Sequence, residues 1–204
     1  MRGTLGLAAI TFTSLAFLAS RGETVRPLEA GTALRMDLGE IVGRSELVLE
    51  ARVVSTTPVE GPGGLVWTDA QLLVDRTFLG ADQGVRTVRL PGGVLPSGRG
   101  TVVPGMPTLV PGEDVFLMLT GASESGGRVV VGLSQGRFRV VRDVTGARFA
   151  VRRNGGGVLV DGVTGHVTPE GSREVIEYAE MVAMLESAAA ATRAGRGDAG
   201  GEGR

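Results

Sequence analysis

The sequence has no cysteine and no lysine, and it holds one histidine in 204 residues. Without cysteine the chain forms no disulfide bonds and carries no cysteine-linked lipid. A single histidine without cysteine is too little for the usual zinc sites, so we expect neither a metal nor a cofactor. The basic residues are all arginine and are scattered along the chain, which argues against a nucleic-acid partner.

Aromatic residues are also scarce, whereas glycine is abundant, with 34 residues. This composition predicts many tight turns and short strands. The length suits one domain of ordinary size, and without disulfide bonds that domain must be stabilised by its apolar core.

The amino-terminal segment has the pattern of an export signal. Arg2 provides the positive charge, residues 4–19 are uncharged and mostly apolar, and small residues close the segment. We expect residues 1–20 to be a signal peptide, residues 21–35 to be a linker, and the protein to be secreted or periplasmic. A retained signal that anchors the chain is the alternative, whereas cleavage would leave no stable membrane insertion.

We expect residues 36–192 to form one β-rich domain. Asp37 precedes apolar residues at helical spacing and predicts a short helix. Strand-like apolar patterns, separated by glycine-rich turns, occupy the segments 46–56, 65–80, 85–93, 114–121, 127–143, 146–153 and 157–160. Because no helices separate these strands, they predict a mainly β fold, an antiparallel barrel or sandwich.

The carboxyl-terminal region has the strongest helical pattern. A Thr-Pro start signal at Thr168 and apolar residues on one face predict a helix over residues 168–192 that packs on the barrel. The glycine-rich, polar residues 193–204 predict a disordered tail.

Residues 132–136, Gly-Leu-Ser-Gln-Gly, match the Gly-x-Ser-x-Gly pattern of the hydrolase nucleophile elbow. Asp143, Asp161 and His166 follow Ser134 in the chain order of such a triad. An elbow requires a helix directly after the serine, but the following residues are strand-like, so we interpret the motif as a bend in a sheet. A hydrolase that uses Ser134 and His166 is kept as an alternative.

The order of strands resembles the netrin-like, OB-type barrel of the tissue inhibitors of metalloproteinases over residues 44–141. The matching motifs are the opening strand Glu46–Val53, the Phe-Leu-Gly sequence at 78–80, and the strand over Gly112–Leu117. The resemblance implies a five-stranded barrel flanked by a carboxyl-terminal helix, and a binding role. The inhibitors chelate zinc through an amino-terminal cysteine, which this chain lacks, so no functional residue carries over.

The segment 90–113 is long for a connection between strands. It contains proline, Arg99 and several apolar residues, including Val94, Leu95, Val102, Val103 and Met106. Long loops of this kind are commonly binding surfaces, and proline lowers the entropy cost of presenting one. The alternative is that the apolar residues fold back and plug one end of the barrel.

Trp67 is the single tryptophan, and it stands on the second predicted strand. It is a candidate for a binding hot spot or for a core anchor. With the loop, it leads us to expect an exported, non-catalytic module that binds a protein, with a protease as one candidate partner. A structural protein of the cell envelope is the remaining alternative.

Overall fold

The computed structural model describes residues 32–81, 84–155 and 157–199. The expected signal peptide and most of the expected linker lie outside these residues. The elements, in chain order, are β1 (Thr32–Leu34), α1 (Leu38–Gly43), β2 (Leu47–Glu60), a 3₁₀ turn (Pro62–Gly64), β3 (Val66–Leu79), β4 (Val85–Pro91), β5 (Gly93–Val94), β6 (Gly100–Thr101), β7 (Asp114–Leu119), a second 3₁₀ turn (Leu133–Gly136), β8 (Arg137–Arg142), β9 (Arg148–Arg153), β10 (Val158–Val160), β11 (Val167–Thr168), β12 (Arg173–Glu177) and α2 (Tyr178–Ala199).

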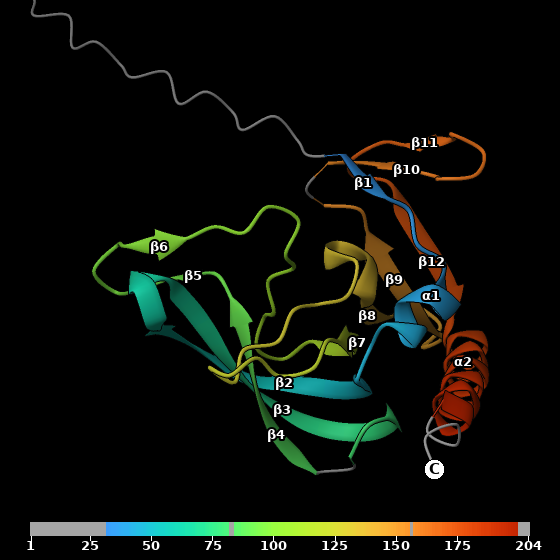
Figure 1. Ribbon diagram of the computed structural model, residues 1–204, viewed down its shortest axis with the longest axis horizontal. Helices are drawn as coiled ribbons and strands as arrows, with labels where there is room; N and C mark the ends of the chain where they lie inside the picture. The colour runs from blue at the N-terminus through green and yellow to red at the C-terminus, as the bar shows by residue number, and fades with distance from the viewer. Residues whose placement is uncertain (1–31, 82–83, 156, 200–204) are drawn as a thin grey trace, which may run out of the picture.

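Seven strands form one antiparallel sheet in the order β12-β9-β8-β7-β2-β3-β4 (Figure 1). Beside it, β1, β10 and β11 form a three-stranded sheet, and β5 pairs with β6. Single bridges from Arg89 to Gly127 and from Leu119 to Val130 connect β4 to β7 through the segment that follows β7 in the chain. The prediction of a mainly antiparallel β fold with one carboxyl-terminal helix is therefore confirmed, although no further strand among the described residues closes a barrel.

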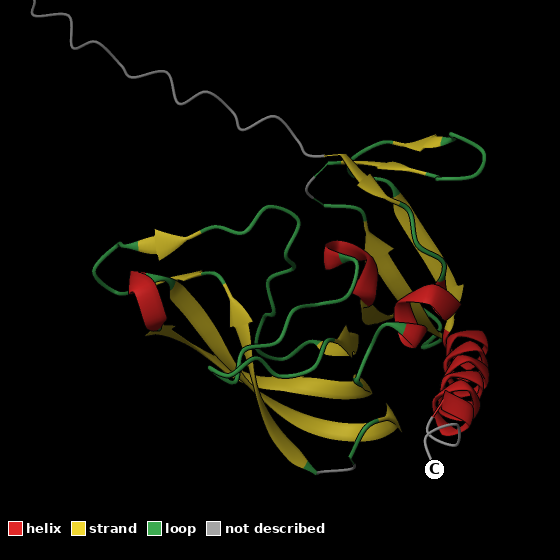
Figure 2. Cartoon of the chain, in the orientation of Figure 1, coloured by secondary structure: helices red, strands yellow, loops and turns green. Residues whose placement is uncertain are grey.

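Strands β2 and β7 are shared by two hydrophobic cores, because their successive side chains alternate between the two faces of the sheet. The strand-walled core, on one face, contains Leu47, Leu49, Ala51, Val53, Ala70, Leu72, Val88, Leu90, Leu109, Val115, Leu117, Leu119 and Val130. The helix-covered core, on the other face, contains Met36, Ile41, Val42, Val48, Phe78, Leu79, Phe116, Met118, Val131, Phe138, Ala150, Met181, Leu185 and Ala189. Figure 2 shows both α-helices gathered at the end of the molecule that holds this second core.

The helix predicted after Asp37 is present as α1. Asp37 accepts a hydrogen bond from the Glu40 N–H at 2.7 Å, and the Glu40 carboxylate accepts one from the Asp37 N–H at 3.1 Å. This reciprocal capping satisfies backbone donors at the start of the helix. Ile41 and Val42 are buried against α2 in the helix-covered core.

The expected boundaries of the carboxyl-terminal helix are wrong at both ends. Residues Arg173–Glu177, expected to be helical, form β12 and pair with β9, so α2 begins at Tyr178. The alternation of exposed and half-buried residues in β12 has the period of a strand. The helix then continues to Ala199, through most of the expected tail. The expected linker also ends earlier, because Thr32–Leu34 form β1 and pair with β10.

The segment 127–143 was expected to be one long strand with a bend near its glycines. The bend is confirmed, but it takes the form of a 3₁₀ turn over Leu133–Gly136, and β8 begins only after it. Gly132 and Leu133 have positive φ angles of 66° and 58°, and this left-handed backbone turns the chain. No helix in the described part of the chain is long and apolar enough to cross a membrane.

Candidate functional site

The loop predicted over residues 90–113 forms a small hairpin that is hydrogen-bonded to the start of β3. The Gly92 N–H donates to the Val66 carbonyl at 2.9 Å, and the Thr68 hydroxyl donates to the Gly92 carbonyl at 2.7 Å. From the other strand of the hairpin, Thr101 accepts the Val66 N–H at 2.8 Å through Oγ1. A Cβ at Gly93 would lie 2.6 Å from Thr68 Oγ1, so the close approach requires glycine there.

A cavity of about 290 Å³ lies beneath this hairpin, and we call it the loop hollow. Its lining is Thr68, Leu90, Pro91, Gly92, Gly93, Val94, Thr101, Val102, Val103, Met106, Pro107, Thr108 and Leu109. The side-chain hydroxyls of Thr68 and Thr101 both bond to backbone groups of the hairpin and β3. The hollow therefore offers mainly apolar contact.

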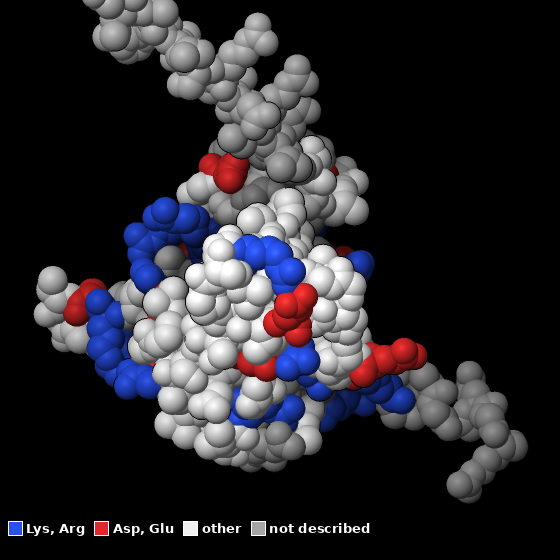
Figure 3. Space-filling view, turned by 90° about the vertical axis from the view of Figure 1, so that its left-hand side faces the viewer, with Lys and Arg blue, Asp and Glu red and all other residues white. Residues whose placement is uncertain are grey.

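The apolar residues of the loop divide into a buried set and an exposed set. Leu109 is 4 % exposed and belongs to the strand-walled core, and Met106 packs against that core, so these two side chains act as a plug. Val94 and Val102 are 61 % and 85 % exposed and stand at the rim of the hollow. Figure 3 faces the side of the molecule that carries the hairpin and shows a mostly uncharged surface with scattered charged groups.

Leu95 and Arg99 lie at the tip of the hairpin, outside the lining of the hollow. The Leu95 N–H donates to the Arg99 carbonyl at 2.8 Å, which closes the turn. Arg99 also forms an ion pair with Glu60 at 2.5 Å, so the tip is linked to the end of β2. About half of each charged side chain is exposed, so this link contributes little to stability.

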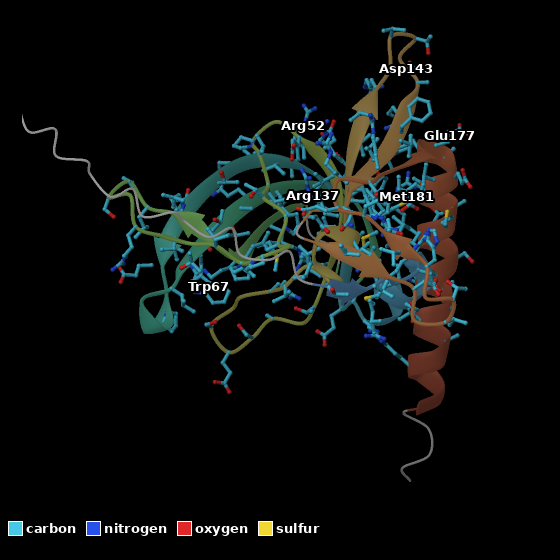
Figure 4. All side chains as sticks on the ribbon, turned by 90° about the horizontal axis from the view of Figure 1, so that it is seen from above. Arg52, Trp67, Arg137, Asp143, Glu177 and Met181 are labelled. Carbon is cyan, nitrogen blue, oxygen red and sulfur yellow. The ribbon has the colours of Figure 1, made fainter. Side chains whose placement is uncertain are left out.

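Trp67 belongs neither to the strand-walled core nor to the lining of the loop hollow. Its indole is half-buried between Gly61 and Gly127, where a Cβ on either glycine would clash with the ring. The indole N–H is buried without a hydrogen-bond partner among the described residues. Figure 4 places Trp67 in the half of the molecule opposite Met181 of α2. The ring packs between the turn after β2 and the segment after β7, and it belongs to neither core.

The structure separates the residues of the hydrolase motif. Ser134 accepts the Gly155 N–H at 3.3 Å, and the chain continues from its turn into β8, where an elbow would have a helix. His166 is exposed in the connection between β10 and β11, and its backbone N–H donates to Thr164 Oγ1 at 3.2 Å. No hydrogen bond joins Ser134 to His166 in the described part of the chain.

The aspartates considered for the triad stabilise turns. The Asp143 carboxylate accepts hydrogen bonds from Thr145 and Ala147 in the β8–β9 hairpin, and those from Thr145 chiefly lower the pKa of Asp143. The Asp161 carboxylate accepts the backbone N–H groups of Thr164 and Val163, and the bonds from Thr164 chiefly lower the pKa of Asp161. Both carboxylates thus have local structural partners.

A second cavity, which the sequence did not suggest, lies beside the start of α2. This polar hollow measures about 390 Å³ and is lined by Glu50, Arg52, Leu73, Asp75, Arg76, Asp114, Val140, Arg142, Arg148 and Tyr178. The Tyr178 hydroxyl donates to the Glu50 carboxylate at 2.8 Å, and the Arg148 guanidinium lies 3.5 Å from the centre of the tyrosine ring. Burial, followed by the hydrogen bond to Glu50, raises the pKa of Tyr178.

The polar hollow contains charges of both signs. Arg52 binds Asp114 through two hydrogen bonds of 2.8 and 3.1 Å, and Arg76 pairs with Glu186 of α2 at 3.3 Å. The sequence contains one indication of this polar hollow. Glu50 is an acidic residue within the apolar run of β2, at a position that faces the helix-covered core. No group of three or more potential metal ligands occurs within the described ranges.

Comparison with known protein families, with curated proteins and with solved structures finds no match to this chain. The geometry of its own residues is therefore the basis for a functional proposal.

Proposed function

We propose that the protein is an exported, non-catalytic binding module whose loop hollow receives an apolar side chain of a protein partner. The observation that carries this proposal is the pair of exposed valines, Val94 and Val102, at the rim of an apolar cavity. Water-exposed apolar side chains gain free energy when a partner covers them, at about 25 cal/mol per Å² of apolar surface. Next to a concave apolar surface, they fit the edge of a binding site.

The size and chemistry of the hollow favour a side chain over a free polar ligand. A volume of about 290 Å³ is at the lower limit for a small-molecule pocket. The hydroxyls of Thr68 and Thr101 already bond to backbone groups, so few groups are free to orient a polar molecule. An aliphatic or aromatic side chain, presented by a partner's surface, needs no such orientation.

Two further parts of the proposal come from the sequence. Residues 1–20 are proposed as an export signal, which would place the partner outside the cytoplasm. The netrin-like resemblance of residues 44–141 is proposed as the origin of the fold, and it supports a binding role without the inhibitors' cysteine.

The test places a photo-crosslinking amino acid at Val102 in the full chain, expressed in the producing organism. We expect one dominant protein adduct. A matched probe at Val163, which is 96 % exposed in the β10–β11 connection, should not form that adduct. The same adducts from both positions, or none from folded protein, would contradict the proposal.

A second set of variants separates binding from stability. In purified components, Val94→Ser with Val102→Ser should weaken binding of the captured partner at least tenfold while the melting temperature stays nearly constant, because both side chains are exposed. Leu109→Ala, at a buried position, should instead lower the melting temperature clearly. Unchanged binding in the double serine variant would exclude the rim of the hollow as the interface.

A further inference from the structure

Strand β12 forms one edge of the seven-stranded sheet (Figure 1). Its residues, Arg173–Glu177, pair with β9 along one side. Within the described residues no strand pairs with the other side, so that edge presents backbone groups to solvent. Such an edge can accept a further strand.

The backbone hydrogen bonds show which residues of β12 face the open edge. The Asn154 N–H donates to the Ser172 carbonyl at 2.8 Å, just before β12 begins. In an antiparallel ladder every second residue of a strand directs its backbone hydrogen bonds to the same neighbour. Because Ser172 bonds toward β9, the next even-numbered residues, Glu174 and Ile176, also bond to β9. Arg173 and Val175 therefore direct their N–H and C=O groups outward. Glu177 directs its N–H outward, whereas its C=O, directly before α2, accepts the first hydrogen bond of that helix.

The same three residues also expose their side chains on the face opposite the helix-covered core. Val175 is 52 % exposed, and neither Arg173 nor Glu177 has an ion-pair or hydrogen-bond partner within the described part of the chain. By contrast, Glu174 accepts a hydrogen bond from Arg152 Nε at 2.8 Å and forms an ion pair with this arginine. Two opposite charges thus flank a valine on an unpaired edge.

We propose that β12 pairs with β12 of a second copy of this chain, in antiparallel orientation and centred on Val175. In this register Val175 faces its own counterpart, and Arg173 of each copy faces Glu177 of the other. Opposite charges placed directly across two strands are favourable, and a two-fold axis creates this pair twice. Within one chain the two residues are four positions apart on a strand, roughly 13 Å, which is too far for a direct ion pair.

The backbone geometry agrees with the same register. In an antiparallel pair, a residue whose N–H and C=O groups point toward the partner strand exchanges both hydrogen bonds with the residue opposite it. Val175 directs both groups toward the open edge, as this arrangement requires. A shift of the register by one residue would place residues that bond to β9 opposite residues that face the open edge. The backbone hydrogen bonds between the two copies could then not form.

Apolar contact continues across the proposed interface. Val151 of β9 lies directly beside Val175 in the sheet register and is half-buried. Pairing of two copies would therefore create one row of four valines across both sheets. Because the pairing consumes both open edges, it closes as a dimer and leaves no β12 edge for further growth.

Charge-swap variants of the full chain test the register by analytical ultracentrifugation. Arg173→Glu and Glu177→Arg alone should each raise the dimer dissociation constant roughly tenfold or more, because two attractive pairs become repulsive. The combined Arg173→Glu and Glu177→Arg variant should restore dimerisation. A wild-type chain that stays monomeric, a dimer that ignores the single swaps, or a failed restoration overturns the proposal.

The absence of cysteine allows an independent test with a single introduced thiol. Val175→Cys should form a disulfide-linked dimer under mild oxidation, because Cα atoms about 5.5 Å apart in such a pair suit a disulfide. Val85→Cys, at an exposed valine on the opposite edge strand β4, is the matched control and should stay monomeric. Equal cross-linking at both positions overturns the proposal.

This proposal does not depend on the proposed function. Strand β12 and the β5–β6 hairpin, whose residues line the loop hollow, lie in different halves of the molecule (Figure 1). The double serine variant at Val94 and Val102 should therefore leave the dimer unchanged, and the charge swaps should leave the loop hollow intact.

Discussion

The strand-walled core and the helix-covered core share β2 and β7 but differ in what fills them. The strand-walled core contains only aliphatic side chains, whereas the helix-covered core contains every phenylalanine that is buried among the described residues, Phe78, Phe116 and Phe138. The interior of a tightly curved sheet is narrow, and small aliphatic residues fill it. The layer between a helix and a sheet is wider and accommodates the aromatic rings.

The polar hollow lies on the same face of the sheet as the helix-covered core. The helix-covered core ends at Tyr178, the first residue of α2. On the same side of the sheet, next to Tyr178, charged residues of the strands line the polar hollow in place of apolar ones. Tyr178 stands at this border, where its ring packs 5.8 Å from Phe116 while its hydroxyl binds Glu50. One strand face thus changes from a core to a polar hollow within a few residues.

The sharpest test of the two-core arrangement uses adjacent residues of β7. Phe116 enters the helix-covered core and Leu117 the strand-walled core, and both are fully buried. We expect Phe116→Ala to lower the free energy of unfolding by about 3–5 kcal/mol and Leu117→Ala by about 2–5 kcal/mol. Urea denaturation measures both.

Because β2 and β7 belong to both cores, each variant should keep a single unfolding transition with an unchanged m-value. The two variants would then differ only in midpoint. A biphasic transition in either variant would show that the cores unfold separately, against the shared-strand arrangement.

The border between the core and the polar hollow gives the next largest effect. Tyr178→Phe removes the hydroxyl that binds Glu50, which is 6 % exposed and has no ion-pair partner among the described residues. Leaving this carboxylate without its donor should cost about 1–3 kcal/mol. Adding Glu50→Leu should recover part of the loss, and a double-mutant cycle measures the coupling. Additive effects of the two substitutions would show that the hydrogen bond does not contribute.

The pH dependence of stability should report the same contact. The sequence has no lysine and no cysteine, so Tyr178, the single tyrosine, is the main side chain that titrates at alkaline pH below arginine. Since its pKa is raised in the folded state, its stabilising effect is fully present below pH about 10 and is lost as the pH rises through the folded pKa. Unfolding measured from pH 8 to 11 should show this decline in the wild-type chain and not in Tyr178→Phe.

Much of the fold could be predicted from local patterns. Apolar residues on both faces of the segment "VFLML" indicate a strand buried on both sides, and β7 takes this position between the cores. The start of α2 could not be predicted, because a Thr-Pro signal at Thr168 is compatible with a turn as well as a helix. Pairing with β9, which is a tertiary contact, decides that Arg173–Glu177 form a strand.

The candidate sites were predicted less completely for a related reason. The sequence places Val94, Val102 and Leu109 in one apolar loop, but only the folded chain separates a buried plug from an exposed rim. The polar hollow brings together residues of β2, β3, β7, β8, β9 and α2. A local sequence pattern cannot predict that residues of six elements line one cavity. The one indication in the sequence is Glu50, an acidic residue within an apolar strand.

The ion pair of Arg99 and Glu60 should have the smallest effect and thereby show what holds the loop in place. Arg99→Gln should change the free energy of unfolding by less than about 1 kcal/mol, and salt should reduce even that difference, because both side chains are half exposed. The backbone bonds of Gly92 and the burial of Leu109 remain in this variant. Thermal unfolding at low and high salt measures the effect. A loss comparable to that of Leu117→Ala would mean that the tip of the hairpin, and not its buried base, secures the loop against the sheet.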